Sequence, residues 1–260
     1  MKPRVIPLAL LKGDSLVFTS QQFVPWRSFG SLAQFLKLQI SRGADELIVL
    51  DIDATRTSKS VSNRTLSLIR SLTNIPVSVG GFIYTPESAT NCIKNGADKI
   101  VIGSLFLENP GMINDISKVI GAQSVTLKLD YSFSEVIGEF VLFDYRFSST
   151  TAITLKKAIS MLDSLEFGEI VLSSVDGDGI MKGIDLSVLD LTANINCPVI
   201  LSGGAASDID FIKGFRSQQL SGIAASTLFA YTKHTPLTIK TSLEESGIPT
   251  RQSISKYTKF

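Results

Sequence analysis

Short apolar runs alternate along the chain with longer segments of helical spacing. The apolar runs fall at residues 5–11, 46–52, 77–79, 99–102, 125–129, 169–172, 199–201 and 222–225. Runs of this kind are typical of strands buried on both faces. Helices are predicted at residues 31–41, 63–72, 86–95, 110–120, 151–165, 185–191, 208–217 and 236–246. Eight strand–helix units predict a closed parallel (β/α)8 barrel of the TIM type, with a doubly wound open sheet as the alternative.

Three connections are longer than the others. Residues 15–29 are predicted to form a polar and aromatic loop, and residues 53–62 a second loop. Residues 137–143 are expected to form a small hairpin before the fifth helix. Linker-like and low-complexity segments are lacking, so we expect one domain over residues 1–260, with half-barrels at about 1–122 and 123–260.

Composition fits this architecture and narrows the class of protein. A chain of 260 residues with 44% hydrophobic content is long enough for one barrel, which typically needs about 250 residues. With 25 basic and 24 acidic residues, it lacks the charge of a nucleic-acid or membrane-surface binder. Cys92 and Cys197 are predicted to be buried free thiols without metal-ligand spacing, and no metal or cofactor is expected. Without a cleavable signal pattern or a spanning apolar run, a cytoplasmic location is expected.

A glycine turn follows the strands at residues 77–79 and 199–201, and other residues repeat at the same spacing of 122 or 123 positions. The repeated sets are Glu46 with Glu169, Asp53 with Asp176, Gly80-Gly81 with Gly203-Gly204, and Gly103-Ser104 with Ala225-Ser226. A glycine turn between a strand and a helix lets a phosphate approach backbone N–H groups. The repeat therefore predicts two phosphate cradles at one mouth, unless the first is a remnant of duplication, since Phe82 crowds it.

Several motifs carry a resemblance to a known family. They are Asp45-Glu46-Leu47, Leu50-Asp51, Gly96-Ala97-Asp98-Lys99, Glu108-Asn109-Pro110, Asp176-Gly177-Asp178-Gly179 and Ser202-Gly203-Gly204-Ala205. From residue 4 to about residue 251 the chain resembles the cyclase subunit of imidazole glycerol phosphate synthase, the HisF family. The histidine-pathway isomerase shares the fold and the duplication, but the Asp-Gly-Asp-Gly and Gly-Ala-Asp-Lys motifs fit the cyclase better. The resemblance implies a bisphosphorylated substrate and a heterodimer with a glutaminase (HisH-like) that supplies ammonia from the opposite face.

One position departs from the family pattern. The family uses two aspartates, at the ends of the first and fifth strands, as general acid and base, and Asp130 matches one of them. Leu10 stands where the other belongs, and overlaying residues 5–11 on 125–131 also pairs Leu10 with Asp130. Because leucine cannot transfer a proton, imidazole formation is expected to slow by about 10²–10⁴-fold. Phe18 also lies near the position of a family lysine. Asp130 remains the candidate acid or base, with a loop-capping role as the alternative.

Leu10-Leu11-Lys12 and residues 51–55 resemble a branch of this family that is associated with surface-polysaccharide (lipopolysaccharide) gene clusters. That branch implies a lyase or synthase subunit of a glutamine amidotransferase complex, delivering ammonia to a separate amidotransferase that acts on a sugar. Three alternatives stay open: the ordinary histidine-pathway cyclase, a stand-alone sugar-phosphate isomerase or lyase with Asp130 as base, and a non-catalytic barrel that conducts ammonia.

The remaining candidates divide between the two ends of the strands. The predicted substrate and phosphate ligands at the carboxyl ends are Lys12, Asp51, Gly80, Gly81, Gly103, Ser104, Asp176, Gly203, Gly204, Ala225 and Ser226. Asp51 and Asp176 could instead close turns, and Lys12 could be a solvated side chain.

At the amino ends, Arg4, Glu46, Lys99 and Glu169 begin four otherwise apolar strands. Their burial would be costly without mutual pairing. They match the family's charged gate below the ammonia passage, with an ordinary ion-pair cluster as the alternative. Asp98 and Gln123 match the face on which the glutaminase docks.

Overall fold

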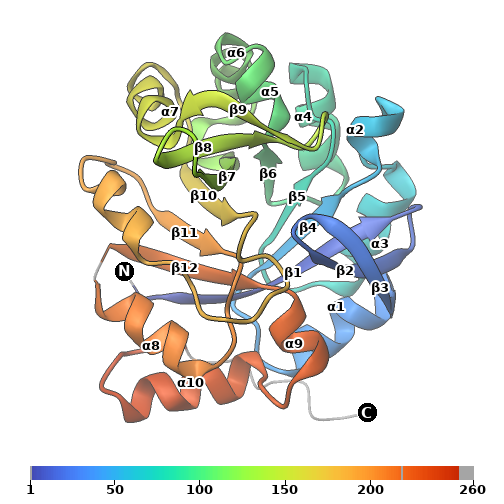
Figure 1. Ribbon diagram of the computed structural model, residues 1–260. Coiled ribbons are helices and arrows are strands. Elements are labelled where there is room, and N and C mark those ends of the chain that lie inside the picture. The colour runs from blue at the N-terminus through green and yellow to red at the C-terminus, as the bar shows by residue number, and fades with distance from the viewer. Residues whose placement is uncertain (1, 218, 252–260) are drawn as a thin grey trace.

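The computed structural model describes residues 2–217 and 219–251, and residues 1, 218 and 252–260 of the expected domain lie outside the described part. Eight parallel strands form its centre: β1 (Arg4–Lys12), β4 (Leu47–Asp51), β5 (Val77–Gly80), β6 (Lys99–Ile102), β7 (Val125–Ser134), β10 (Glu169–Ser174), β11 (Val199–Ser202) and β12 (Leu220–Ala225). Because β1 pairs with both β4 and β12, and β7 pairs with β10, the sheet closes on itself. The predicted (β/α)8 barrel is confirmed (Figure 1).

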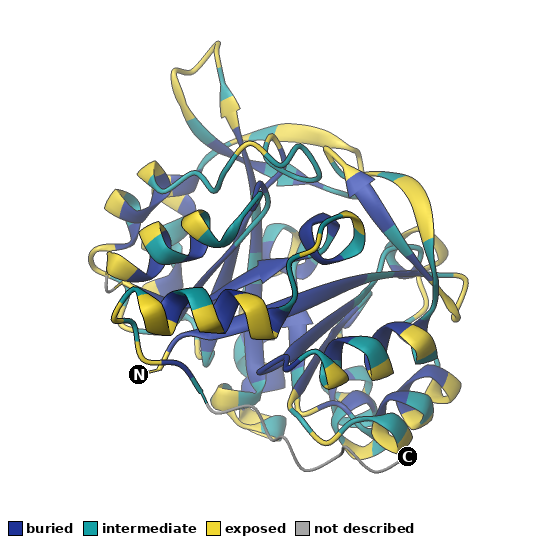
Figure 2. Cartoon of the chain, turned by 90° about the horizontal axis from the view of Figure 1, so that it is seen from below, coloured by how far each residue is buried: buried dark blue, intermediate teal, exposed yellow. Residues whose placement is uncertain are grey.

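Helices surround this barrel. The longer ones are α1 (Leu32–Ser41), α3 (Asn63–Leu72), α4 (Pro86–Asn95), α6 (Gly111–Ile120), α7 (Leu155–Met161), α8 (Asp208–Arg216) and α10 (Pro236–Glu245). Ser31, Thr85 and Thr235 begin α1, α4 and α10 with capping boxes, which satisfy the first free N–H groups. The outer helix faces are exposed and the inner faces buried (Figure 2). Among the described helices, none combines the length and the apolar composition required of a membrane span.

Strand alternation divides the core in two. Side chains that point outward from the strands pack under the helices in one large cluster. Inward-pointing side chains form a separate cluster in the barrel centre: Ile6, Leu8, Ile48, Val101, Val171, Ile200 and Ala224. Leu10 and Leu50 pack against the carboxyl end of this inner cluster. The barrel interior is therefore apolar between its two polar ends.

The prediction of a loop at residues 15–29 is wrong. Residues Leu16–Gln21 form strand β2 and residues Val24–Ser31 form strand β3, which pair as an antiparallel hairpin. β1 continues beyond the barrel to Lys12, and this extension pairs with β2, with Leu10 opposite Phe18. The β-branched and aromatic residues from Val17 to Thr19 suit this ladder.

The second half also differs from the sequence expectation. β7 continues past Asp130 to Ser134 and pairs with β8 (Glu139–Asp144), so the hairpin predicted at 137–143 has its turn at 135–138 instead. A third strand, β9 (Ser149–Thr154), takes the first residues of the helix predicted at 151–165, because Thr150 and Thr151 favour extended backbone. That helix is only α7, followed by the 3-10 turn η2 (Leu162–Ser164).

Smaller corrections concern short helices in the connections. The helix predicted at 185–191 is the 3-10 helix η3 (Ser187–Thr192), which begins where the Asp185 carboxylate accepts from the Ser187 N–H at 2.9 Å. Three further helices occupy segments expected to be loops: α2 (Ala54–Thr57), α5 (Ser104–Glu108) and α9 (Thr227–Tyr231). A further 3-10 turn, η1 (Ala122–Ser124), precedes β7.

Candidate functional site

The carboxyl ends of the strands surround a cavity of ≈ 120 Å³, enough for several water molecules or a small ligand. The predicted site residues that line it are Asp51, Gly80, Gly81, Gly103, Ser104 and Asp130. Leu10 lines it as well and contributes an apolar side chain. The cavity, called the mouth below, therefore unites most of the first-half candidates.

A second cavity of ≈ 30 Å³ adjoins the mouth and contains the second-half candidates Gly203, Gly204, Ala225 and Ser226. Gly204 has a φ of +93°, and a Cβ there would lie 2.2 Å from the Gly183 carbonyl oxygen, so the turn requires glycine. Within the described residues, the backbone N–H of Gly204 has no hydrogen-bond acceptor. This turn can therefore offer a donor to an anion.

The matching turn in the first half has a different character. Gly81 is followed by Phe82, whose φ of +46° is a left-handed conformation that a bulky side chain adopts only at a cost in strain. The Phe82 ring stacks on Tyr84 with centroids 4.3 Å apart, and both rings line the mouth. An aromatic wall thus stands where the second half has small residues.

Asp130 contacts a basic side chain that sequence reasoning missed. Alternation along β7 places Thr126, Lys128 and Asp130 on the inner face, and Lys128 Nζ donates to Asp130 Oδ1. Both side chains are nearly buried, with 12% and 13% exposure. Burial raises the pKa of Asp130, Asp178 adds to this increase, and the Lys128 ammonium opposes it. The sequence signal for this contact was the strand alternation, which places Lys128 and Asp130 on the same face of β7.

The Asp-Gly-Asp-Gly loop after β10 ties down two hairpins. Asp176, the predicted ligand, does not line either cavity among the described residues, and it accepts from Ser132 Oγ at 2.7 Å and Phe133 N at 2.8 Å. Asp176 therefore holds the extension of β7, and its role as a substrate ligand stays a prediction.

Asp178 lines both cavities in its place. It accepts from Ser20 Oγ at 2.5 Å and Phe23 N at 3.0 Å, which fixes the tip of the β2–β3 hairpin over the mouth. Burial raises the pKa of Asp178, and these two hydrogen bonds oppose the increase.

Asp51 closes a turn and lines the mouth, and its role as a substrate ligand stays a prediction, whereas Lys12 lies outside the mouth. Asp51 Oδ1 accepts from the N–H groups of Asp53 at 3.0 Å and Ala54 at 3.1 Å, and its side chain also faces the mouth. Burial raises its pKa, and those hydrogen bonds oppose the increase. The Lys12 ammonium lies 5.7 Å from the centre of the Phe18 ring and is outside both cavities.

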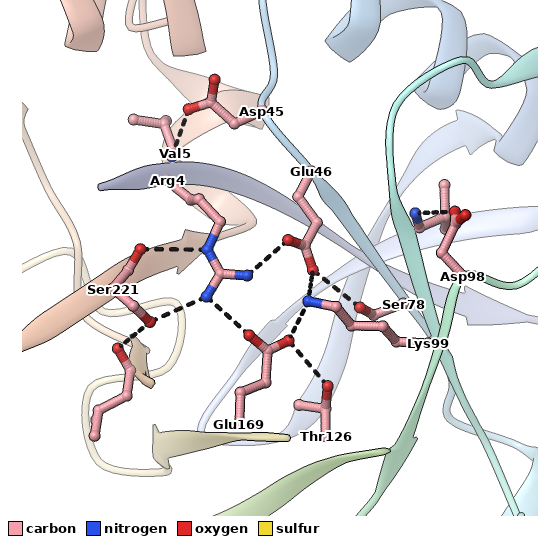
Figure 3. Close-up of polar contacts among 12 residues, drawn as sticks. Arg4, Val5, Asp45, Glu46, Ser78, Asp98, Lys99, Thr126, Glu169 and Ser221 are labelled. Carbon is pink, nitrogen blue, oxygen red and sulfur yellow. Dashed lines mark hydrogen bonds and ion pairs between the residues drawn. The ribbon is translucent and has the colours of Figure 1, made fainter. Parts of the chain in front are cut away.

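The four charged residues at the strand starts meet in one ring at the amino end (Figure 3). Arg4 contacts Glu46 at 2.7 Å and Glu169 at 2.8 Å. Lys99 contacts the same two carboxylates at 3.3 Å and 2.7 Å. Each cation therefore bridges both anions, and the four formal charges sum to zero.

Neighbouring hydroxyls complete this ring. Ser78 donates to Glu46 and Thr126 to Glu169, each at 3.0 Å, while Arg4 donates to Ser221 Oγ at 3.0 Å. Burial would raise the pKa of Glu169, but the Arg4 and Lys99 charges outweigh it and hold that pKa below its ordinary value. A buried charge cluster is tolerated when its polar atoms are satisfied in this way.

Within the ring, Lys99 is the most exposed member, at 23%, whereas the side chains of Arg4, Glu46 and Glu169 are 5% exposed or less. Asp98, next to Lys99, is exposed and accepts from Val77 N at 2.8 Å. Gln123 is also exposed, just before β7. Both predicted docking residues therefore lie at the amino end of the barrel, on the side of the ring.

The two cysteines are free thiols, with Cys92 buried and Cys197 partly buried. Burial raises the pKa of each to about 11. Both are therefore protonated at neutral pH and poor nucleophiles.

Comparison with known proteins places the chain among relatives of one kind. The sequence profile of the family described as "Histidine biosynthesis protein" matches residues 4–235. The chain is 30% identical to the imidazole glycerol phosphate synthase subunit HisF of Leuconostoc mesenteroides, over 95% of this chain and 98% of that protein. It is 32% identical to the Francisella philomiragia HisF over 95% and 97% of the two chains. For the Pyrococcus furiosus HisF, the identity is 31% over 96% and 99%.

Proposed function

Because the chain belongs to the histidine biosynthesis protein family, we propose that it is a HisF-like synthase subunit that receives ammonia from a HisH-like glutaminase. In this proposal the glutaminase docks at the amino end of the barrel, and ammonia passes along the barrel axis to the mouth. The acceptor there, or on a further amidotransferase, is a sugar of surface-polysaccharide biosynthesis.

The observation that carries the proposal is the ring of Arg4, Glu46, Lys99 and Glu169. If no molecule passed along the barrel axis, apolar side chains could be buried at this end at a lower free-energy cost than four charged ones. Beyond the ring the interior is apolar up to Leu10 and Leu50. Neutral ammonia can cross such an interior far more easily than ammonium, because burying an unpaired charge is unfavourable. Lys99 is the member best placed to move, since its side chain reaches solvent.

The glycine turns support a phosphorylated ligand. Gly203 and Gly204 form a cradle with an available N–H group, beside Ser226. The first-half turn at Gly81 is narrowed by Phe82 and Tyr84. We therefore place the tighter phosphate site in the second half.

Leu10 supports the assignment to polysaccharide synthesis over histidine synthesis. The mouth retains Asp130 but presents Leu10 from β1 where the resemblance implies the second proton-transfer group. The second candidate function, the histidine-pathway cyclase, is favoured by the names of the relatives.

A binding experiment tests the proposal. The full chain is mixed with the HisH-like glutaminase of the same organism, and association and glutamine hydrolysis are measured. We expect a heterodimer and faster hydrolysis. Gln123→Lys, on the proposed docking face, should weaken association at least about fivefold. Ser149→Lys is the matched control, because Ser149 is exposed on β9 beyond the opposite end of the barrel. No association with the glutaminase, or equal effects of the two variants, would contradict the proposal.

A further inference from the structure

Lys128 is the only basic side chain among the described residues that line the mouth. The other charged groups there are the carboxylates of Asp51, Asp130 and Asp178. The Lys128 ammonium contacts the Asp130 carboxylate. Lys128 can therefore act on the mouth through that carboxylate.

Most of the surroundings of Asp130 disfavour its ionised form. Leu10 and Leu50 form apolar lining of the same cavity, and Asp178 faces Asp130 from the loop after β10. The hydroxyl of Tyr145, beyond β8, is the remaining titratable group close to Asp130. Apart from Lys128, nothing basic faces this carboxylate from the described elements that line the cavity. The Ser173 hydroxyl also favours the ionised form of Asp130, but it carries no charge. Without Lys128, Asp130 would therefore lack an opposite charge, and burial would favour its protonated form.

The hairpin β2–β3 strengthens the dependence on Lys128. The Phe23 ring covers Lys128, with its centroid 4.9 Å from Nζ, and the Phe23 N–H is held by Asp178. A covered ion pair is screened less by water, so its two charges interact more strongly.

We propose that Lys128 is a positioning residue that keeps Asp130 ionised in the covered mouth and thereby makes Asp130 a proton acceptor. This inference rests on the proposed function only in treating the mouth as the reactive site. In the absence of a second carboxylate from β1, it assigns Asp130 the role of general base rather than general acid. Lys128 acts on the chemistry through Asp130.

The test follows the Asp130 carboxyl by carbon-13 NMR as a function of pH, with Asp130→Asn to assign its signal. Lys128→Met should shift the titration upward by more than one pH unit, a tenfold change in proton affinity. Lys128→Arg retains the positive charge and should restore a midpoint near that of the unmodified chain. Lys12→Met is the matched control, because Lys12 lies at the same end of the barrel but outside the mouth, and it should leave the midpoint unchanged. An Asp130 midpoint that Lys128→Met leaves unchanged would overturn the proposal.

A stability measurement covers the case in which Lys128→Met does not fold. The double variant Lys128→Met/Asp130→Asn removes both charges and should fold, since neither partner is left unpaired. A double variant with a higher free energy of unfolding than Lys128→Met supports the pairing, whereas a double variant as unstable as Lys128→Met overturns it. Neither measurement requires the glutaminase or a substrate, so this inference and the proposed function can fail separately.

Discussion

At the scale of single residues, the mouth is defined by Leu10 and Asp130. The two positions are related by the internal repeat, and both side chains line the same cavity. The Asp130 side chain can accept a proton, whereas the Leu10 side chain cannot. This asymmetry is the reason that we expect a departure from the chemistry of the HisF relatives.

Leu10→Asp tests this residue-scale account. A carboxylate at position 10 should raise the rate of imidazole formation from the histidine-pathway substrate and ammonia by roughly tenfold or more, part of the 10²–10⁴-fold that one acid–base group supplies. Asp130→Asn in the unmodified chain should change the rate little, because the pair is already incomplete. Leu10→Asp should also lower the free energy of unfolding, by less than the roughly 1.5–3 kcal/mol of a fully buried leucine, because Leu10 is only partly buried. A rate unaffected by Leu10→Asp would contradict the account.

At the scale of elements, the β2–β3 hairpin over the mouth and the β7–β8 hairpin share one anchor. In the loop after β10, Asp176 holds the β7–β8 hairpin and Asp178 holds the β2–β3 hairpin. Each carboxylate accepts from one serine hydroxyl and one phenylalanine N–H. This loop is therefore the point through which the two halves of the mouth are connected.

Asp178→Ala should loosen the β2–β3 hairpin selectively. Amide exchange at Phe23 is expected to accelerate about 10–100-fold, because a hydrogen bond to a charged acceptor contributes about 1.5–3 kcal/mol. Exchange at Phe133 should change little. Asp176→Ala is the matched variant. It should accelerate amide exchange at Phe133 and change exchange at Phe23 little. Hydrogen exchange followed by NMR distinguishes these outcomes, and equal acceleration at both amides in each variant would argue against separate anchors.

The sequence predicted regular elements more successfully than connections. The helix expected at residues 63–72 and the strand at 99–102 have the same bounds in the structure, since their apolar spacing reports packing against the barrel. The strand β2 was missed because its partner, the extension of β1, lies outside the repeating pattern. Lys128 was missed although alternation along the strand places it on the same face as Asp130, because alternation does not show that the two side chains pair. Asp178 was missed because the two aspartates of one loop differ only in the hairpin that each contacts.

At the scale of the whole molecule, the barrel has two polar ends joined by an apolar interior. The amino end carries a neutral ring of two cations and two anions. The mouth carries three carboxylates and one ammonium. The ring carboxylate Glu169 has a pKa below its ordinary value, whereas Asp51, Asp130 and Asp178 have raised pKa values. Protonation in acid should therefore destabilise the ring at the amino end, whereas protonation of the mouth carboxylates should stabilise the mouth.

Arg4→Met should destabilise the fold by about 3–5 kcal/mol at pH 7, since it leaves Glu46 and Glu169 facing each other with only Lys99 between them. Because the folded-state pKa of Glu169 is depressed, its contribution is present above its unfolded pKa of about 4.3 and is lost as the pH falls through the folded value. The difference between the unmodified chain and Arg4→Met should therefore shrink at acidic pH. Urea unfolding at pH 7 and at about pH 3 measures both values, and a constant difference would contradict the pairing account.

The most direct test of the central claim is the ratio of imidazole product formed to glutamine consumed. The chain, its glutaminase, glutamine and the histidine-pathway substrate are combined, and both products are measured in one reaction. The account predicts that glutamine hydrolysis is stimulated by the barrel while imidazole product stays below about one per hundred glutamines consumed, since one acid–base group is missing. A ratio near one would contradict the account and identify the chain as an ordinary histidine-pathway cyclase.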